Sequence, residues 1–375
     1  MAAVPSQFDS KTLPVCVSTA ERPTAQSPAV GKPRRRNKPA TLAPGDRIGA
    51  WRVEGELGRG GMGSVYAATH CGFGKRAALK LCHKTILGPQ FTVDTFLREA
   101  RVVHLVNHPG VPDVFATGTY DGRPYLAMER LHGKTLGDYL DATPITKLAA
   151  LDILFEICRV LEAAHGAGVI HRDLKLDNVF VLDVAGPVQI KVLDWGVARI
   201  AGEPDPMTGM IAGTLTYVAP EQVRADELTP ASDIYSLGVL AYQLLCGEPP
   251  FVNPSDLDLI RMHLHAPPPR PSAWWPEVPV GLEMMMLAML AKDPTQRPTI
   301  GDVMTGIVAA RADVEPKKLT LMSSVRALPK APPVDMLGRS APINFGALLS
   351  AVPRRVVRTV VALAAVSGTL AALIG

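Results

Sequence analysis

The chain has 375 residues, of which 47% are hydrophobic and 20% charged, and its formal net charge is +4. This length exceeds what one compact core usually holds, so we expect two lobes or domains with tails. The charge is small for the length and gives no sign of a nucleic-acid-binding surface. The five cysteines are odd in number and lack C-x-x-C spacing, which argues against a disulfide framework or a zinc site and fits a reducing cytosol.

Residues 1–46 differ from the rest of the chain in composition. They are rich in Pro, Ser, Thr and Ala, and they carry a basic cluster at Arg34, Arg35, Arg36 and Lys38. Such a segment buries too little apolar surface to order itself, so we predict a disordered tail. Its beginning contains no apolar run of about 7–15 residues, as a secretory signal would require.

The next part of the chain, about 47–130, is expected to form a mainly β lobe. Residues 47–70 alternate apolar and polar side chains around a glycine cluster, which indicates two strands joined by a Gly-rich turn. Apolar residues at helical spacing predict one helix between later strands. We expect that helix at Val93–Asn107 and the strands at Arg76–Cys82, Val114–Tyr120 and Arg123–Met128.

From about residue 131 to 312 the pattern becomes mainly helical. A strand–loop–strand region is expected at Gly168–Leu193, followed by a loop without periodicity at Ala201–Ala212. No internal repeat is visible, and the fold class is therefore α+β with two lobes. The expected helices are Ile145–His165, Asp233–Gly247, Pro254–His265, Val280–Ala291 and Ile300–Ala312.

The glycine cluster has the spacing Gly58-x-Gly60-x-x-Gly63-x-Val65. A dinucleotide fingerprint of this spacing would lead into a helix, whereas strand-like residues follow here. Glycines in a hairpin turn let backbone N–H groups approach phosphate oxygens. An ordinary Gly-rich hairpin is the alternative.

Lys80 and Glu99 form a candidate pair. A lysine inside an apolar strand either reaches out to solvent or points inward to a charge. Glu99, at the edge of the expected helix, could pair with Lys80 and hold its ammonium group against phosphate oxygens. Arg98 and Arg101 flank Glu99, and we expect both to be solvated.

The octapeptide HRDLKLDN at His171–Asn178 carries the strongest chemical signal. Asp173 can accept a hydrogen bond from a substrate hydroxyl, and Lys175 can neutralise a transferring phosphoryl group. Asn178 and, after the next strand, Asp194 offer oxygen ligands of the kind that Mg²⁺ prefers. Each carboxylate alone could be a loop cap, but several such groups at fixed spacing favour phosphoryl transfer.

These motifs, in this order, resemble the bacterial eukaryotic-like (Hanks-type) serine/threonine protein kinases over Ile48–Ala312. Further matching motifs are the strand lysine in AALK, the helix glutamate in FLREA, and DWG at Asp194. The series ends with APE at Ala219–Glu221, SDIYSLG at Ser232–Gly238 and RPT at Arg297–Thr299.

The resemblance implies how ATP would bind, with Mg²⁺, or alternatively Mn²⁺, held by Asn178 and Asp194. Residues 128–131 would be the hinge, where backbone groups meet adenine. The remaining implied contacts are glycines over the phosphates (Gly58, Gly60, Gly63), a roof over adenine (Leu57, Val65, Ala78), a floor (Phe180), the gatekeeper (Met128) and the hinge residues Glu129 and Leu131.

The resemblance also assigns catalytic and structural roles. Asp173 would be the catalytic base, and Lys175 two residues later is typical of serine/threonine kinases. Thr214 would contact both of these side chains. Protein substrates would therefore be phosphorylated on serine or threonine. The implied structural residues are Asp233, which braces the HRD turn, and the ion pair Glu221–Arg297.

Two features concern regulation. Arg172, directly before Asp173, resembles the arginine of kinases that are switched by phosphorylation of the activation segment. Thr208 is the hydroxyl residue in the middle of that segment, so it is our candidate autophosphorylation site. The family usually has Phe where this chain has Trp195, and many relatives have Trp where this chain has Tyr235.

The C-terminal part contains a linker, 313–355, and an apolar segment, 356–375. The last 17 residues, 359–375, carry no charge and follow Arg354, Arg355 and Arg358. A helix of that length would reach about 26 Å, against a hydrocarbon core of about 30 Å. We predict a single-pass anchor in the inner membrane with the kinase in the cytoplasm; a wholly cytoplasmic protein is the alternative.

Two function classes follow from these patterns. An active kinase needs Lys80, Asp173, Asn178 and Asp194, and all four are present. A pseudokinase that binds nucleotide or acts as a scaffold is the alternative, and such proteins typically lack one or more of these residues. A dimer is a further possibility. No nucleic-acid partner is expected.

Overall fold

The computed structural model describes residues 42–84, 87, 92–203 and 214–314. The predicted linker beyond residue 314, the membrane segment 356–375 and Thr208 lie outside the described residues, as does most of the predicted N-terminal tail. The end of that tail, residues 42–46, contradicts the prediction of disorder. Leu42 is buried in the small lobe, and Gly45 N donates to Val53 O at 2.9 Å, so the folded part begins earlier than composition indicated.

The small lobe is a six-stranded antiparallel sheet with the order β1-β2-β3-β4-β6-β5. Alternation in the sequence explains the start of β2, where Trp51 and Val53 enter the apolar core on one face of the sheet while Arg52 and Glu54 are exposed. The five strands expected in this lobe are confirmed, and the two-residue β1, which was not predicted, precedes them. The bounds are Arg47–Ile48 (β1), Trp51–Arg59 (β2), Gly63–His70 (β3), Arg76–Cys82 (β4), Val114–Tyr120 (β5) and Arg123–Met128 (β6).

Helix α1 (Val93–Val106) packs on this sheet, as predicted. It begins at Thr92, whose hydroxyl accepts from Thr95 N at 3.2 Å, and it ends at Asn107 in the left-handed conformation. Phe96 is buried against Cys82 and Leu126 of the sheet. The helix is therefore fixed where Glu99, three residues after Phe96, can reach Lys80 of β4.

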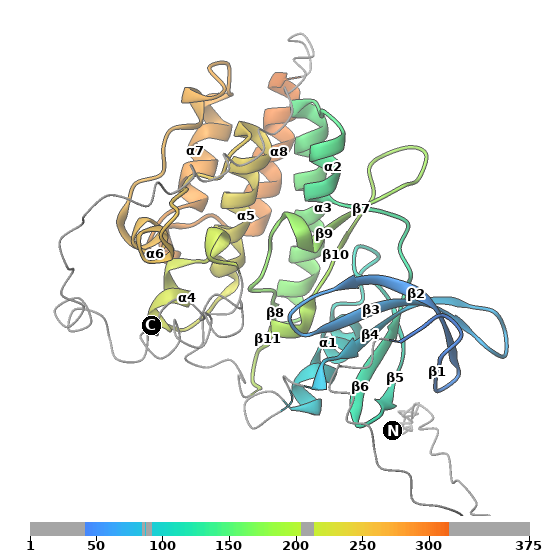
Figure 1. Cartoon of the computed structure of the whole chain (residues 1–375). Helices are drawn as coiled ribbons and strands as arrows, with labels where there is room; N and C mark the ends of the chain where they lie inside the picture. Colours follow the sequence, from blue (N-terminus) through green and yellow to red (C-terminus); the bar gives the residue numbers. More distant parts are fainter. Residues whose placement is uncertain (1–41, 85–86, 88–91, 204–213, 315–375) are drawn as a thin grey trace, which may run out of the picture. The chain divides into compact units, whose positions relative to one another are not determined.

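The large lobe is mainly helical (Figure 1). Its helices α3 and α5 are buried along much of their length. The five predicted helices are confirmed with shifts of a few residues, but the short α2 and α4 were not predicted, because one or two turns show too little periodicity. The bounds are Leu136–Ala142 (α2), Lys147–Gly166 (α3), Pro220–Arg224 (α4), Pro230–Cys246 (α5), Asp256–His265 (α6), Val280–Met289 (α7) and Ile300–Val314 (α8).

The large lobe also contains two small antiparallel sheets, and their strands border the loops that carry the HRDLKLDN motif and Asp194. One has the order β10-β9-β7 and the other pairs β11 with β8. The segment from β8 to β9 contains the HRDLKLDN motif, and β10 leads directly into Asp194. The strand bounds are Gly133–Thr135 (β7), Val169–Ile170 (β8), Val179–Leu182 (β9), Ile190–Val192 (β10) and Arg199–Ile200 (β11).

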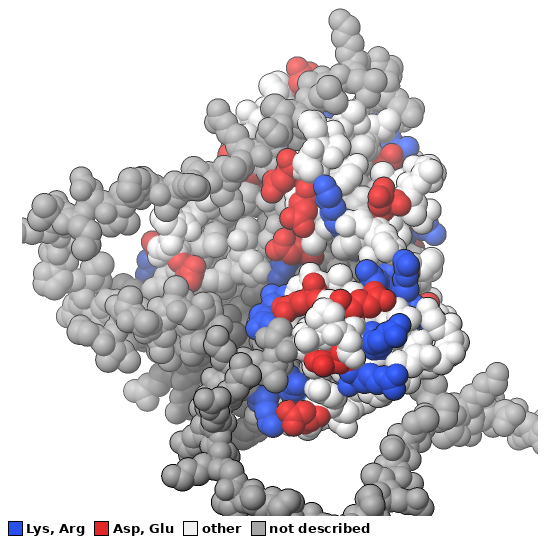
Figure 2. Space-filling view, turned by 45° about the vertical axis from the view of Figure 1, so that its right-hand side comes forward, with Lys and Arg blue, Asp and Glu red and all other residues white. Residues whose placement is uncertain are grey.

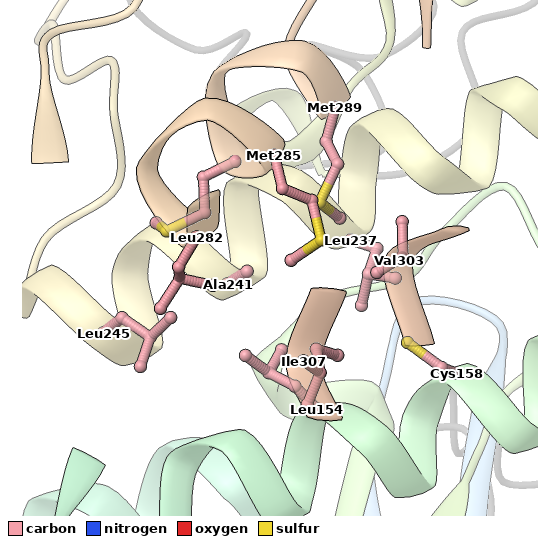
Figure 3. A pocket seen from close by; sticks show the side chains of 11 residues that line it. Leu154, Cys158, Leu237, Ala241, Leu245, Leu282, Met285, Met289, Val303 and Ile307 are labelled. Atoms are coloured by element: carbon pink, nitrogen blue, oxygen red, sulfur yellow. The ribbon is translucent and has the colours of Figure 1, made fainter. Parts of the chain in front are cut away.

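A cavity lies within the large lobe, between α3, α5, α7 and α8 (Figure 3). Apolar side chains and three flexible methionines surround it, and these can adapt to an irregular space. None of the predicted site residues lines it. Its lining residues are Leu154, Cys158, Leu237, Ala241, Leu245, Leu282, Met285, Met286, Met289, Val303 and Ile307.

The charged surface is mixed in sign on the face drawn in Figure 2, where Lys and Arg side chains lie among Asp and Glu. Several exposed charges are paired, such as Arg59 with Glu56 at 2.9 Å. Within the described ranges, no helix is long and apolar enough to cross a membrane.

A buried polar cluster joins α5 to α6. The Tyr235 hydroxyl lies 2.9 Å from His263 Nδ1 and accepts from Lys292 Nζ at 3.3 Å. Tyr235 thus brings a hydrogen-bonding hydroxyl into this core. Burial lowers the pKa of His263 to about 4, and the charge of Lys292 acts in the same direction.

We predict that His263 makes the fold sensitive to acid. The unfolded chain binds a proton near pH 6.5, but the folded protein does so only near pH 4, so stability falls as the pH drops through this range. Between pH 7 and pH 5 this one group should cost about 2 kcal/mol of unfolding free energy. Urea unfolding at pH 7 and pH 5 measures the decrease in unfolding free energy between these two pH values. This decrease should be smaller by that amount in His263→Asn than in the wild type. An equal loss in both proteins would contradict the prediction.

Candidate active site

The turn that contains the candidate base is braced by a buried carboxylate. Asp233, fully buried in α5, accepts from His171 N at 2.8 Å and from Arg172 N at 2.9 Å. Arg172 has φ 72°, a left-handed conformation that costs a non-glycine residue about 1–3 kcal/mol. The two hydrogen bonds from Asp233 compensate for that strain. His165 also binds Asp233, at 2.9 Å, which the sequence did not indicate.

Asp173 lies where three predicted site residues converge. Lys175 Nζ donates to Asp173 Oδ2 at 2.9 Å and to the Thr214 hydroxyl at 2.9 Å. The backbone N–H of Thr214 donates to Asp173 Oδ1 at 3.1 Å. The Asn178 amide nitrogen donates to Asp173 Oδ2 at 2.9 Å. The carboxylate is therefore fixed in orientation by groups from two loops, as a positioned proton acceptor would need.

The two candidate metal ligands lie on adjacent loops. Leu193 N donates to Asn178 O at 2.7 Å, which ties the residue before Asp194 to the loop of Asn178. Because the Asn178 nitrogen is used by Asp173, its side-chain oxygen remains for a cation. Among the described residues no group of three His, Cys, Asp or Glu side chains could hold a metal. One amide and one carboxylate oxygen fit Mg²⁺, which keeps waters and phosphates as its other ligands.

Lys80 joins the two lobes. Its ammonium lies 2.7 Å from Glu99 Oε2 in α1 and 2.6 Å from Asp194 Oδ1. Burial alone would lower the pKa of Lys80, but the two carboxylates outweigh it and raise that pKa. Burial raises the pKa of Glu99, whereas the charge of Lys80 lowers that of Asp194. The predicted pair with Glu99 is present, and Asp194 extends it.

The glycine cluster forms the turn between β2 and β3. Gly60 N donates to Gly63 O at 2.9 Å, which closes the turn. A Cβ atom on Gly63 would clash with the carbonyl oxygen of Leu81, so a larger residue would push the loop away from β4. No helix follows the turn, which excludes the dinucleotide fingerprint.

The predicted walls of the nucleotide site are contributed by both lobes. Val65 pairs with Gly58 across the hairpin and with Lys80 on the other side, and Ala78 pairs with Met128 at the start of the hinge. Leu57 is exposed near the end of β2, Leu131 is half-buried at the last position of the predicted hinge, and Phe180 lies in β9 of the large lobe.

The hinge residue Glu129 has contacts that the sequence did not indicate. Its N–H donates to Asp113 O at 2.8 Å, so an adenine edge would meet its carbonyl oxygen. Its carboxylate accepts from Lys191 Nζ of β10 at 2.6 Å. Lys191, a lysine within a strand like Lys80, thus anchors the hinge to the large lobe.

Trp195 is nearly fully buried beneath the candidate metal ligand. Its indole N–H donates to Val192 O at 3.0 Å, and its ring meets that of His171 edge-on at 4.5 Å. A phenylalanine at this position could not make this hydrogen bond, because its ring has no N–H group. The indole is held in this way next to Asp194, whose carboxylate lies 2.6 Å from Lys80 Nζ.

One expectation about α1 was wrong. Arg101 is exposed and pairs with Asp94, as expected, but Arg98 is only 4% exposed. Its Nε donates to Ala198 O at 3.3 Å, and its Nη1 lies 3.2 Å from Glu203 Oε2. Helical spacing cannot reveal a partner that lies about a hundred residues away in sequence.

The predicted ion pair Glu221–Arg297 is present and buried. It is bidentate, with N–O distances of 2.6 and 2.8 Å, and Arg297 also donates to Ala231 O and Ala291 O. Burial would raise the pKa of Glu221, but its hydrogen bonds to Arg297 lower it overall. The pair ties α4 to the loop before α8.

Comparison with known proteins agrees with this geometry. The model of the protein kinase domain family matches residues 51–306. Serine/threonine-protein kinase Pkn1 of Myxococcus xanthus is 40% identical over 256 residues, which cover 68% of this chain and 37% of Pkn1. Serine/threonine-protein kinase pkn3 of the same organism is 35% identical over 293 residues, or 74% of this chain and 54% of pkn3.

A third relative is covered more fully. Serine/threonine-protein kinase PknA of Mycobacterium tuberculosis is 34% identical over 307 residues, which cover 80% of this chain and 70% of PknA. The chain thus matches about a third to a half of the length of the two Myxococcus proteins. It belongs to the protein kinase family, among the bacterial eukaryotic-like (Hanks-type) serine/threonine kinases.

Proposed function

We propose that this chain transfers the γ-phosphate of ATP to serine and threonine hydroxyls of proteins. The observation that carries the proposal is the position of Asp173, bound to Lys175, Thr214 and Asn178. Such a carboxylate can accept the proton of an incoming hydroxyl, and Lys175 can stabilise charge on the transferred group. No observation on the described residues favours the pseudokinase alternative.

The nucleotide would lie between the lobes. Lys80, held by Glu99, would contact the phosphates, and backbone N–H groups of the Gly-rich turn would cover them. Adenine would lie between Ala78 and Phe180, at the hinge. Asn178 and Asp194 would hold Mg²⁺, or alternatively Mn²⁺, which neutralises charge on the phosphates when bound.

The acceptor preference rests on Lys175 and Thr214. Lys175 reaches the Thr214 hydroxyl at 2.9 Å, so the segment that would receive the substrate is tied to the catalytic loop. This link supports serine and threonine as acceptors, in agreement with the names of the relatives. A dimer stays a prediction from the sequence.

Replacing the proposed base should abolish most activity. Asp173→Asn removes the proton acceptor but keeps its shape, so the rate should fall about 10²–10⁴-fold. Incorporation of labelled phosphate from ATP with Mg²⁺ measures it. Asp183→Asn, an exposed aspartate after β9, is the control and should keep the wild-type rate. Undiminished incorporation in Asp173→Asn would overturn the assignment.

We further propose that autophosphorylation of Thr208 switches the enzyme. The support is the sequence motif, because Thr208 lies outside the described residues. Arg172, buried beside Asp173, is the proposed partner of the phosphate, which brings about −1.5 to −2 charges.

Mass spectrometry of the active protein should find phosphate on Thr208. The modification should be absent from Asp173→Asn, which cannot transfer phosphate, and Thr208→Ala should be less active than the wild type. An active protein without phosphate on Thr208 would refute this part of the proposal.

A C-terminal anchor in the inner membrane is also proposed, with residues 356–375 as the span and the kinase domain in the cytoplasm. The support is the uncharged segment and the arginines before it. The cytoplasmic alternative would leave the same segment in solution.

Fractionation of cell membranes tests the anchor. The full chain should sediment with membranes, whereas a chain ending at Val314, where α8 ends, should not. Val366→Asp in the full chain should weaken insertion, because a central charge costs about 2.5–3.5 kcal/mol. Equal solubility of the full and shortened chains would reject the anchor.

A further inference from the structure

Arg98 lies next to Glu99 in α1 but points to a different part of the molecule. Glu99 binds Lys80 of β4, whereas Arg98 binds Ala198 O and Glu203, which follow the Asp194 loop. Neighbouring residues of a helix face directions about 100° apart, so one turn of α1 serves two partners. The side chain of Arg98 is only 5% exposed.

A tight turn presents Glu203 to that arginine. Strand β11 pairs with β8, and Ala201 N donates to Gly168 O at 2.8 Å. Glu203 N then donates to Ile200 O at 3.3 Å, closing a four-residue turn whose third residue, Gly202, has φ 78°. That positive φ at the third position is typical of a type II turn, which favours glycine.

The turn thus brings Glu203 to a place from which its carboxylate reaches Arg98 in α1. The ion pair is asymmetric in exposure, with Arg98 buried and Glu203 39% exposed. Solvent screening limits its strength, but the pair adds a bond between the turn after β11 and the buried Arg98 of α1. Loss of the carboxylate would therefore weaken the contacts that hold α1 in its position.

We propose that Arg98 and Glu203 form an acidic latch that holds α1 in the position where Glu99 binds Lys80. Both are positioning residues, and they act on the nucleotide site through Glu99. Because the anion is a carboxylate of the chain itself, the latch is in place without phosphorylation of the segment. The inference rests on the kinase activity proposed above and adds a regulator of that site.

The test compares steady-state phosphorylation of a serine peptide by full-length variants. Glu203→Gln keeps the shape and removes the charge, and kcat/KM should fall about five- to tenfold, the lower range for coupled sites. Gly202→Ala should act in the same direction, since alanine is strained at this φ. Arg101→Gln, on the same helix in an exposed pair, is the matched control and should stay at the wild-type value.

A second background separates positioning from general loss of structure. If the latch acts through Glu99, Glu203→Gln should have no further effect on kcat/KM in Glu99→Gln. A similar decrease in both backgrounds, or a Glu203→Gln value equal to that of Arg101→Gln, would overturn the latch. Thermal melting of each variant checks that folding is kept.

The outcomes also distinguish the latch from the proposed function. An inactive wild type, or a wild type matched by Asp173→Asn, would refute the kinase assignment. An active wild type that is sensitive to Asp173→Asn but insensitive to Glu203→Gln would refute only the latch.

Discussion

The Lys80 ammonium, shared by Glu99 and Asp194, is the interaction on which the site depends. It links a strand and a helix of the small lobe to a loop of the large lobe. A buried lysine is stable as a cation only with such partners, and burial of Glu99 has the same requirement. The three groups therefore fix the relative position of α1, β4 and the candidate metal ligand.

Strained and buried groups around this link are compensated by specific bonds. Arg172 and Asp194 both have positive φ. Arg172 directly precedes the proposed base Asp173, and Asp194 is itself a proposed metal ligand. Asp233 stabilises the first through two backbone N–H groups, and Lys80 binds the second. Trp195, the residue directly after Asp194, donates a hydrogen bond from its indole N–H to Val192 O. Rigid support thus surrounds the few side chains that the proposed reaction needs.

The sequence predicted the two lobes and the residues of the motifs, because periodicity and motif spacing depend only on residues that are close together in the sequence. It did not predict α2, whose seven residues are too few for a clear period. It also did not predict that residues 42–46 belong to the folded small lobe. It also missed Lys191 at the hinge and misjudged Arg98. Both bind partners distant in sequence, and only the tertiary fold brings those partners together.

The most direct measurement is the initial rate of phosphate transfer from ATP to a serine peptide by Lys80→Met. Lys84→Met, which changes an exposed lysine shortly after the same strand, is its control. If the Lys80 link organises the site, the rate should fall about 10²–10³-fold, as on removal of a preorganised charge, while Lys84→Met stays near the wild type. A Lys80→Met enzyme as fast as its control would contradict the account.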